Sequence, residues 1–220
     1  MNVDVALAAR ALARHGLVHA YGHVSARVDA SCFVVTPARP LGAMTRDTAM
    51  VSCAIEEPLP AGALAEVRIH QRIYAARGDV AGICRFQSPS VIALSALRQT
   101  PQALHGLGAY FAPAAPLWDD PALVRDPERA TGVATTLGNA RAVVLRGNGA
   151  VTVGATVREA ACHAFFLEDA ARIELAVLAT GEQATPYTSE QAERRAAADA
   201  SLYARMWEFL LGQDFDEVTP

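Results

Sequence analysis

The spacing of apolar residues along this chain changes repeatedly between the period of an α-helix and that of a β-strand, which restricts the fold to a mixture of both. Helical spacing covers residues 3–14, 64–77, 88–97, 130–137, 157–181 and 189–211. Short apolar runs typical of strands cover residues 24–28, 32–36, 50–55, 80–86, 142–145 and 150–153. The alternation predicts an α/β fold. Because the 220 residues contain no internal repeat or linker, we expect one domain spanning residues 1–220.

Two connecting segments carry further signals. Residues 99–129 contain five prolines and show no clear period. A loop of that length is more often functional or interfacial than a neutral connector. The turn Arg146-Gly147-Asn148-Gly149 lies between two apolar runs, and its Asn-Gly step predicts a β-hairpin.

Composition excludes several classes of chemistry, because all 19 basic residues are arginine. A Schiff-base aldolase, a pyridoxal-phosphate enzyme and a Walker-type phosphate loop each need a lysine amine in the site. The formal net charge is −4 and the arginines are scattered. We therefore expect no nucleic-acid partner, since phosphate binding needs positive charge gathered on one face.

The sequence also carries signals of cellular location. Its N-terminal stretch, residues 1–14, lacks the basic region and cleavage site of a signal peptide, and no run of 18 apolar residues occurs. The four cysteines are far apart and have no CxxC spacing, which favours reduced thiols in the core. We expect a soluble, cytoplasmic protein with no membrane partner.

Two groups of polar residues are candidates for chemistry. Glu66 and His70 are four residues apart, which would place them on one face of a helix. They suit general acid or base catalysis, although a surface ion pair or cap is the more common outcome of this spacing. Gly22, His23 and Ser25 lie at a predicted turn into a strand, where backbone amides can face an anionic ligand.

The order of these pieces resembles the class II aldolase/adducin family, over roughly residues 7–180. The resemblance rests on separately placed blocks: Gly22-His23-Val24-Ser25-Ala26-Arg27, Thr36-Pro37, the stretch from Glu66 to Tyr74, Ser88-Pro89, the stretch from Val144 to Ala150, and Glu168. It implies a central, mainly antiparallel sheet flanked by helices on both sides. It also implies that Glu66 is the general acid/base, and that the protein forms a C4 homotetramer with its active site at a subunit interface.

The resemblance further implies a divalent metal held by a His-x-His pair and a later histidine. Those three positions read Arg85, Gln87 and Asn148 in this chain. A guanidinium is a permanent cation, and carboxamide oxygens bind zinc or manganese weakly. We therefore expect no metal and no other cofactor.

Short sequence matches indicate which branch of the family this chain resembles. The sugar-phosphate aldolases have a serine pair before the glutamate and an asparagine after the first glycine, whereas this chain has Leu64-Ala65 and His23. A phosphorylated sugar is therefore not expected. The Gly22-His23 turn, the Pro116–Asp120 stretch and the Arg146-Gly147 step are similar to the branch that contains decarboxylases of hydroxylated aromatic acids.

The substitutions allow two interpretations. In the catalytic one, Arg85 replaces the charge of the metal, Glu66 moves a proton and His23 assists. The predicted substrate-binding residues are then Gln87, Asn148, Ser25, His105 and Thr36. In the other interpretation, Arg85 and Glu66 form a buried ion pair in a relic site, and Arg85→Ala would destabilise the fold by roughly 3 to 5 kcal/mol.

Three functions follow. The favoured one is a metal-independent carbon–carbon lyase that decarboxylates, or cleaves by retro-aldol reaction, a small hydroxyaromatic or oxo carboxylic acid. The second is a non-catalytic binding module or partner subunit that shapes an assembly with an active paralogue. The third is a metal-free dehydratase or isomerase that works through Glu66 at the same cleft.

Overall fold

One seven-stranded sheet organises residues 1–196 and 200–212, which the computed structural model describes. Its strands occur in the spatial order β3-β2-β1-β4-β7-β6-β5. Neighbouring strands are antiparallel except β5 and β6, which are parallel. The predicted mainly antiparallel sheet is confirmed. In chain order the strands are β1 (His23–Arg27), β2 (Cys32–Val35), β3 (Val51–Ala54), β4 (Gly82–Phe86), β5 (Leu117–Trp118), β6 (Ala142–Leu145) and β7 (Ala150–Gly154).

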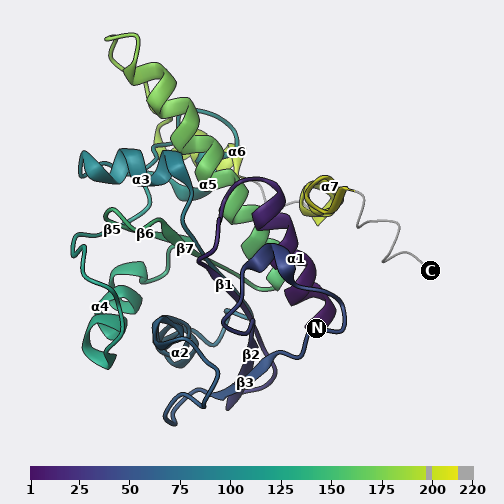
Figure 1. Cartoon of the computed structure of the whole chain (residues 1–220). Helices are drawn as coiled ribbons and strands as arrows, with labels where there is room; N and C mark the ends of the chain where they lie inside the picture. The colour runs from purple at the N-terminus through teal and green to yellow at the C-terminus, as the bar shows by residue number, and fades with distance from the viewer. Residues whose placement is uncertain (197–199, 213–220) are drawn as a thin grey trace.

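Helices cover both faces of the sheet, as expected (Figure 1). The cluster of α1, α3, α5 and α7 packs on one face, and α2 and α4 pack on the other. The α-helices are α1 (Asn2–Arg14), α2 (Arg68–Ala76), α3 (Pro89–Ala96), α4 (Pro127–Leu137), α5 (Val157–Leu178), α6 (Ser189–Arg195) and α7 (Ala200–Leu211). Short 3-10 helices are η1 (Leu41–Ala43), η2 (Ala65–Val67) and η3 (Gly108–Phe111).

Successive side chains of β4 point to opposite faces of the sheet, and the apolar core accordingly consists of two clusters, one on each face. Cys84 and Phe86 belong to the cluster of α1 and α5, whereas Ile83 belongs to the cluster of α2 and α4. Arg85, two residues after Ile83, therefore shares the sheet face that α2 covers. His23 of β1 is the cross-strand partner of Arg85 and lies on the same face.

The strand patterns in the sequence predict every observed strand except β5 to within two residues, but the helical patterns differ in two main places. The stretch 64–77 consists of η2 followed by α2, so Glu66 lies in a 3-10 turn rather than on the α-helix of His70. The stretch 189–211 is not one helix, because α6 ends at Arg195. Residues 197–199 and 213–220, which the predicted domain includes, lie outside the described residues.

The predicted hairpin between β6 and β7 is confirmed, and it brings Asn148 beside the end of β4. Gly149 has φ +81°, and a Cβ atom there would lie 2.0 Å from the carbonyl oxygen of Phe86. Only glycine allows this close approach of the turn to β4. The hairpin thus fixes the Asn148 side chain next to Arg85.

Within the described part of the chain, no helix combines the length and apolarity needed to cross a lipid bilayer.

Candidate active site

A cavity of about 710 Å³ lies where β1 begins and β4 ends. Its lining combines one carboxylate with three guanidinium groups, and it includes the predicted residues His23, Glu66, Arg85 and Gln87. The other two guanidinium groups belong to Arg39 and Arg125. Positive charge therefore exceeds negative charge in the lining, which suits an anionic ligand.

Arg85 is buried, with 4% of its surface exposed. Its Nη2 donates to Asn148 Oδ1 at 2.6 Å and to the Asn148 carbonyl oxygen at 3.3 Å. Gln87 Nε2 donates to the same Oδ1 at 2.7 Å, and a turned Gln87 amide would place its oxygen 3.2 Å from Arg85 Nη2. In either orientation the guanidinium contacts only neutral oxygens. Among the described residues, the buried Arg85 Nε has no hydrogen-bond partner.

Burial lowers the pKa of Arg85 to about 10, although the charge of Glu66 opposes this effect. The group still carries its proton at neutral pH, so a permanent cation lies at the inner wall of the cavity. A buried charge without a paired counter-ion is costly. An anionic ligand that reaches Arg85 would remove that cost.

Glu66 pairs with Arg125 rather than with Arg85. Its Oε1 accepts from Arg125 Nε at 2.8 Å, and the Arg125 side chain is 60% exposed. The relic interpretation requires a buried ion pair between Arg85 and Glu66. This pair is not formed, because Glu66 is paired with Arg125, an exposed residue of the segment before α4. Arg85 and Glu66 both line the cavity.

His23 begins a buried chain of hydrogen-bonded side chains. Its Nδ1 lies 2.7 Å from His70 Nε2, and His70 Nδ1 lies 2.5 Å from Ser25 Oγ. Ser25 Oγ lies 2.8 Å from the hydroxyl of Tyr74. Burial, followed by the charge of Arg85, lowers the pKa of His70 to about 3. Burial, His70 and Arg85 also hold the pKa of His23 well below its usual range, so both rings are neutral.

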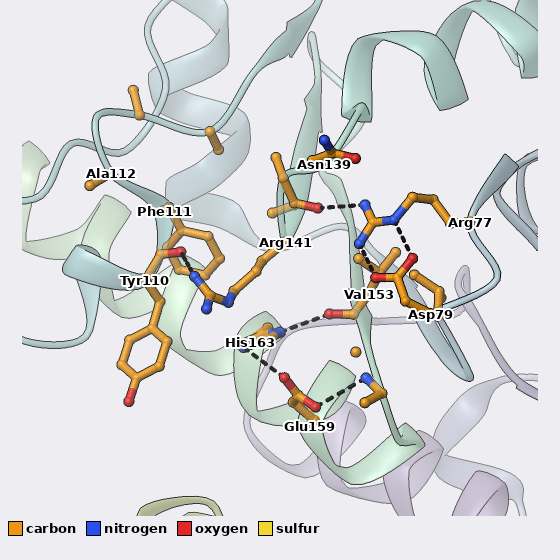
Figure 2. A pocket seen from close by; sticks show the side chains of 17 residues that line it. Arg77, Asp79, Tyr110, Phe111, Ala112, Asn139, Arg141, Val153, Glu159 and His163 are labelled. Carbon is orange, nitrogen blue, oxygen red and sulfur yellow. Dashed lines mark hydrogen bonds and ion pairs between the residues drawn. The ribbon is translucent and has the colours of Figure 1, made fainter. Parts of the chain in front are cut away.

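A second cavity, of about 480 Å³, lies at another edge of the sheet, where β6 begins and β7 ends (Figure 2). Its polar groups are largely engaged with one another. Arg77 forms an ion pair with Asp79, and Arg141 donates to the carbonyl oxygen of Tyr110. His163 Nδ1 contacts the Val153 carbonyl oxygen, while its Nε2 contacts the Tyr203 hydroxyl, so both nitrogens of this buried ring have partners. The cavity at Arg85 is therefore the stronger candidate for chemistry.

Comparison with known proteins decides the family. The model of the class II aldolase and adducin N-terminal domain matches residues 3–175. The chain belongs to this family. A curated relative, the 3,4-dihydroxyphthalate decarboxylase of Rhodococcus jostii (strain RHA1), is 26% identical over 123 residues. That match covers 53% of this chain and about half, 50%, of the relative.

Solved structures show the same fold. An L-fuculose 1-phosphate aldolase from Glaciozyma antarctica PI12 superposes with a TM-score of 0.82 at 21% identity, covering 100% of this chain and 91% of that one. An aldolase II superfamily protein from Pseudomonas syringae superposes with a TM-score of 0.82 at 22% identity, covering 98% of this chain and 92% of that one. The class II aldolase fold of the chain is thereby established.

The metal that the family resemblance implies does not fit the donors at positions 85, 87 and 148. The Arg85 guanidinium already occupies the Asn148 Oδ1 that would have to face a metal ion. A second cation there would be repelled by the first. In residues 1–196 and 200–212, no group of three or more His, Cys, Asp or Glu side chains is arranged to hold a metal.

The structure brings some predicted residues to the cavity and leaves others away from it. Asn148 contacts Arg85, whereas Ser25 lies behind His23 and contacts His70. Thr36 Oγ1 accepts from the Val24 amide, and His105 pairs with Asp169 at 3.0 Å. Neither Thr36 nor His105 lines the cavity of this chain, because each is held by a partner elsewhere.

Three residues at or behind the cavity were missed or misjudged from sequence. Arg125 lies in the irregular segment 99–129, whose length was a signal of function but did not single out a residue. Arg39 follows β2 in a turn with no motif. His70 is fully buried rather than at the surface, because α2 places it against His23 and Ser25 of β1.

Proposed function

We propose that this chain is a carbon–carbon lyase that works without a metal and removes carbon dioxide from a small hydroxyaromatic or oxo carboxylic acid. Retro-aldol cleavage of such a compound is the related reaction. The observation that carries the proposal is the buried Arg85 guanidinium, whose contacts in the described residues are all neutral. A planar guanidinium with free donors suits a carboxylate.

The charge of the cavity supports a substrate with a carboxylate. Arg39, Arg85 and Arg125 line it together with Glu66. Glu66 engages Arg125 Nε, which leaves Arg85 and Arg39 without a carboxylate among the described residues. The proposed substrate places its carboxylate on Arg85 and its hydroxyl or carbonyl group toward His23 and Glu66.

The proposed reaction balances with Glu66 as the group that moves the proton. Glu66 accepts the phenolic or enolic proton of the substrate and then donates it to the carbon that bears the carboxylate. The carbon–carbon bond breaks, its electron pair stays with the substrate carbon, which takes the proton, and carbon dioxide leaves. Solvent then restores the phenolic or enolic proton. Arg85 and the ring of His23 stabilise the negative charge on the substrate oxygen.

The curated relative supports this reaction class, since its name describes a decarboxylase of a dihydroxylated aromatic acid. The sequence also lacks the serine pair expected for a sugar-phosphate site, because Leu64 and Ala65 precede Glu66. Leu64 lines the cavity and adds an apolar wall suited to a ring.

The test is a panel of 3,4-dihydroxyphthalate, hydroxybenzoates and β-oxo acids incubated with purified protein. We expect release of carbon dioxide by the wild type, and losses of at least about 100-fold in Glu66→Gln and Arg85→Met. Arg46→Gln, which changes an exposed arginine outside the cavity, should retain wild-type activity. Loss of water or isomerisation without carbon dioxide would favour the dehydratase or isomerase alternative. Binding without turnover would favour a non-catalytic partner subunit.

We also propose that the protein is a homotetramer with the cavity at a subunit interface. Tyr21 and Leu123 line the cavity, and they are 71% and 48% exposed. Exposed apolar side chains at a cavity entrance suit coverage by a neighbouring subunit.

A further inference from the structure

We propose that the buried chain Tyr74–Ser25–His70–His23 fixes the tautomer of His23, so that its Nε2–H faces the cavity as a hydrogen-bond donor. His23 is then a neutral donor to a substrate oxygen and not a general base. His70, Ser25 and Tyr74 are positioning residues, since they act through His23. The catalytic use of the donor rests on the proposed function, but the tautomer itself does not.

The hydrogen bonds from His23 to Tyr74 form one continuous series, and its inner members are shielded from solvent. Its three contacts measure 2.7 Å from His23 to His70, 2.5 Å from His70 to Ser25 and 2.8 Å from Ser25 to Tyr74. His70 and Ser25 are fully buried, and Tyr74 is 2% exposed. Each contact needs one hydrogen, and a neutral imidazole carries only one, so the direction of the His23–His70 contact fixes the direction of the His70–Ser25 contact.

The two hydroxyl groups at the end of this series, on Ser25 and Tyr74, select that direction. Among the described residues, Ser25 Oγ is the single hydrogen-bond partner of the Tyr74 hydroxyl. If His70 donated to Ser25, the Ser25 and Tyr74 hydroxyls would have two hydrogens but only one contact between them, so one hydrogen would be buried without an acceptor, which is disfavoured. If the donors run from Tyr74 toward His23, each hydrogen meets an acceptor. Tyr74 then donates to Ser25, Ser25 to His70 Nδ1, and His70 Nε2–H to His23 Nδ1.

This direction leaves the hydrogen of His23 on Nε2. The His23 ring lines the cavity, and within the described part of the chain its Nε2 makes no hydrogen bond to protein. Arg85 is the cross-strand partner of His23, and the Arg27 guanidinium lies 4.7 Å from the centre of the Tyr74 ring. Both are cations, and Arg85 disfavours a positive charge on either imidazole. Glu66 lines the cavity together with His23 and is paired with Arg125.

The hydrogen-bonded side chains from Tyr74 to His23 cannot relay a proton from one end of the series to the other. Replacing a proton lost from His23 Nε2 would require Tyr74 to ionise, and burial raises the pKa of Tyr74. In the proposed reaction the proton that reaches the substrate carbon comes from Glu66, and His23 contributes an oriented N–H. Arg85 and His23 are paired on the adjacent strands β4 and β1. They therefore suit a substrate whose carboxylate lies next to a hydroxyl or carbonyl oxygen.

The test is nitrogen NMR of the whole protein labelled with ¹⁵N-histidine, with the signals of His23 and His70 assigned through His23→Gln and His70→Gln. We expect both rings to be neutral and protonated on Nε2. A His23 ring protonated on Nδ1, or a charged ring at neutral pH, would overturn the proposal. The measurement needs no substrate, so it separates failure of this inference from failure of the proposed lyase activity.

Variants along the chain sharpen the result. Tyr74→Phe keeps the Ser25 hydroxyl as the terminal donor, so the Nε2–H tautomer should persist. Ser25→Ala removes the link to His70, so both rings should show a mixture of tautomers. Ser52→Ala, in an exposed position of β3, is the matched control and should leave the spectrum unchanged. An unchanged His23 tautomer in a folded Ser25→Ala protein would contradict the fixing role of the chain.

Discussion

Arg85 is the residue whose energetics differ most between a catalytic and a relic site. In a buried ion pair, removing one partner leaves an uncompensated charge and costs about 3 to 5 kcal/mol. In this structure Arg85 contacts Asn148 and Gln87, which are neutral, and Glu66 has its own partner in Arg125. Replacing the guanidinium with an apolar side chain therefore strands no charge.

We accordingly expect Arg85→Met to change the free energy of unfolding by less than about 1 kcal/mol, or to raise it, because the desolvation cost of the cation and its few hydrogen bonds disappear together. Urea denaturation of the variant and of the wild type measures this. A loss of about 3 kcal/mol or more would mean that Arg85 belongs to a structural ion pair.

His70 makes folding stability depend on pH. Burial and Arg85 lower its pKa to about 3 in the folded protein, whereas the unfolded value is about 6.5. Below about pH 6.5 the unfolded chain binds more protons, so the folded state loses stability as the pH falls toward about 3. Between about pH 7.5 and pH 5 this one group accounts for a loss of about 2 kcal/mol.

The variant His70→Gln should therefore show a fall in unfolding free energy over that range that is smaller than the wild-type fall by about 2 kcal/mol. Comparing the change with pH, rather than the absolute stability, removes the cost of the broken hydrogen-bond chain. His19→Gln, at an exposed position, is the control and should keep the wild-type dependence. Identical falls in His70→Gln and wild type would show that His70 is not held neutral by the fold.

At the scale of elements, the hairpin between β6 and β7 positions Asn148 against Arg85. A Cβ atom on Gly149 would lie 2.0 Å from the carbonyl oxygen of Phe86, so the turn and β4 must separate in Gly149→Ala. Gly147 also has a positive φ, of +68°, but a Cβ atom there would meet nothing within 4 Å.

We expect Gly147→Ala to cost about 1 kcal/mol, from backbone strain alone. Gly149→Ala should cost at least about 2 kcal/mol and should also weaken carboxylate binding, because Asn148 moves away from Arg85. Thermal unfolding of both variants supplies the comparison. Equal losses would mean that the close approach of the hairpin to β4 is not required.

Strands were easier to predict than the site because each strand leaves a local pattern, whereas the site depends on contacts across the fold. β4 and β7 are apolar runs bounded by turns, and both were predicted. β5 has two residues, too few for any period. The positions of His23, Glu66 and Arg85 in the sequence pointed to one cavity through the family resemblance alone.

The remaining contacts could not be read from the sequence. Arg125 reaches Glu66 from 59 positions away, out of a segment with no periodicity. The link between Ser25 and His70 joins β1 to α2 through the register of the sheet and the packing of the helix. His70 looked like a surface residue because its buried partners, His23 and Ser25, lie on β1, far from it in the sequence.

At the scale of the whole molecule, the open side of the cavity carries apolar surface. The exposed side chains of Tyr21 and Leu123 lie at this opening, and burying them would favour association. We expect a mass of about 93 kDa by light scattering, which is four chains of 23.2 kDa. Leu123→Asp should shift the protein toward smaller species. A stable monomer of the wild type would contradict a site completed by a neighbouring subunit.

The central claim is that Arg85 and Glu66 perform carbon–carbon cleavage without a metal. Its most direct test follows labelled carbon dioxide from a carboxyl-¹³C hydroxyaromatic acid, such as 3,4-dihydroxyphthalate, in the presence of a chelator. We predict one carbon dioxide per molecule of product, at a rate that neither the chelator nor added manganese or zinc changes. Activity that disappears with the chelator and returns with one divalent ion per chain would contradict the account.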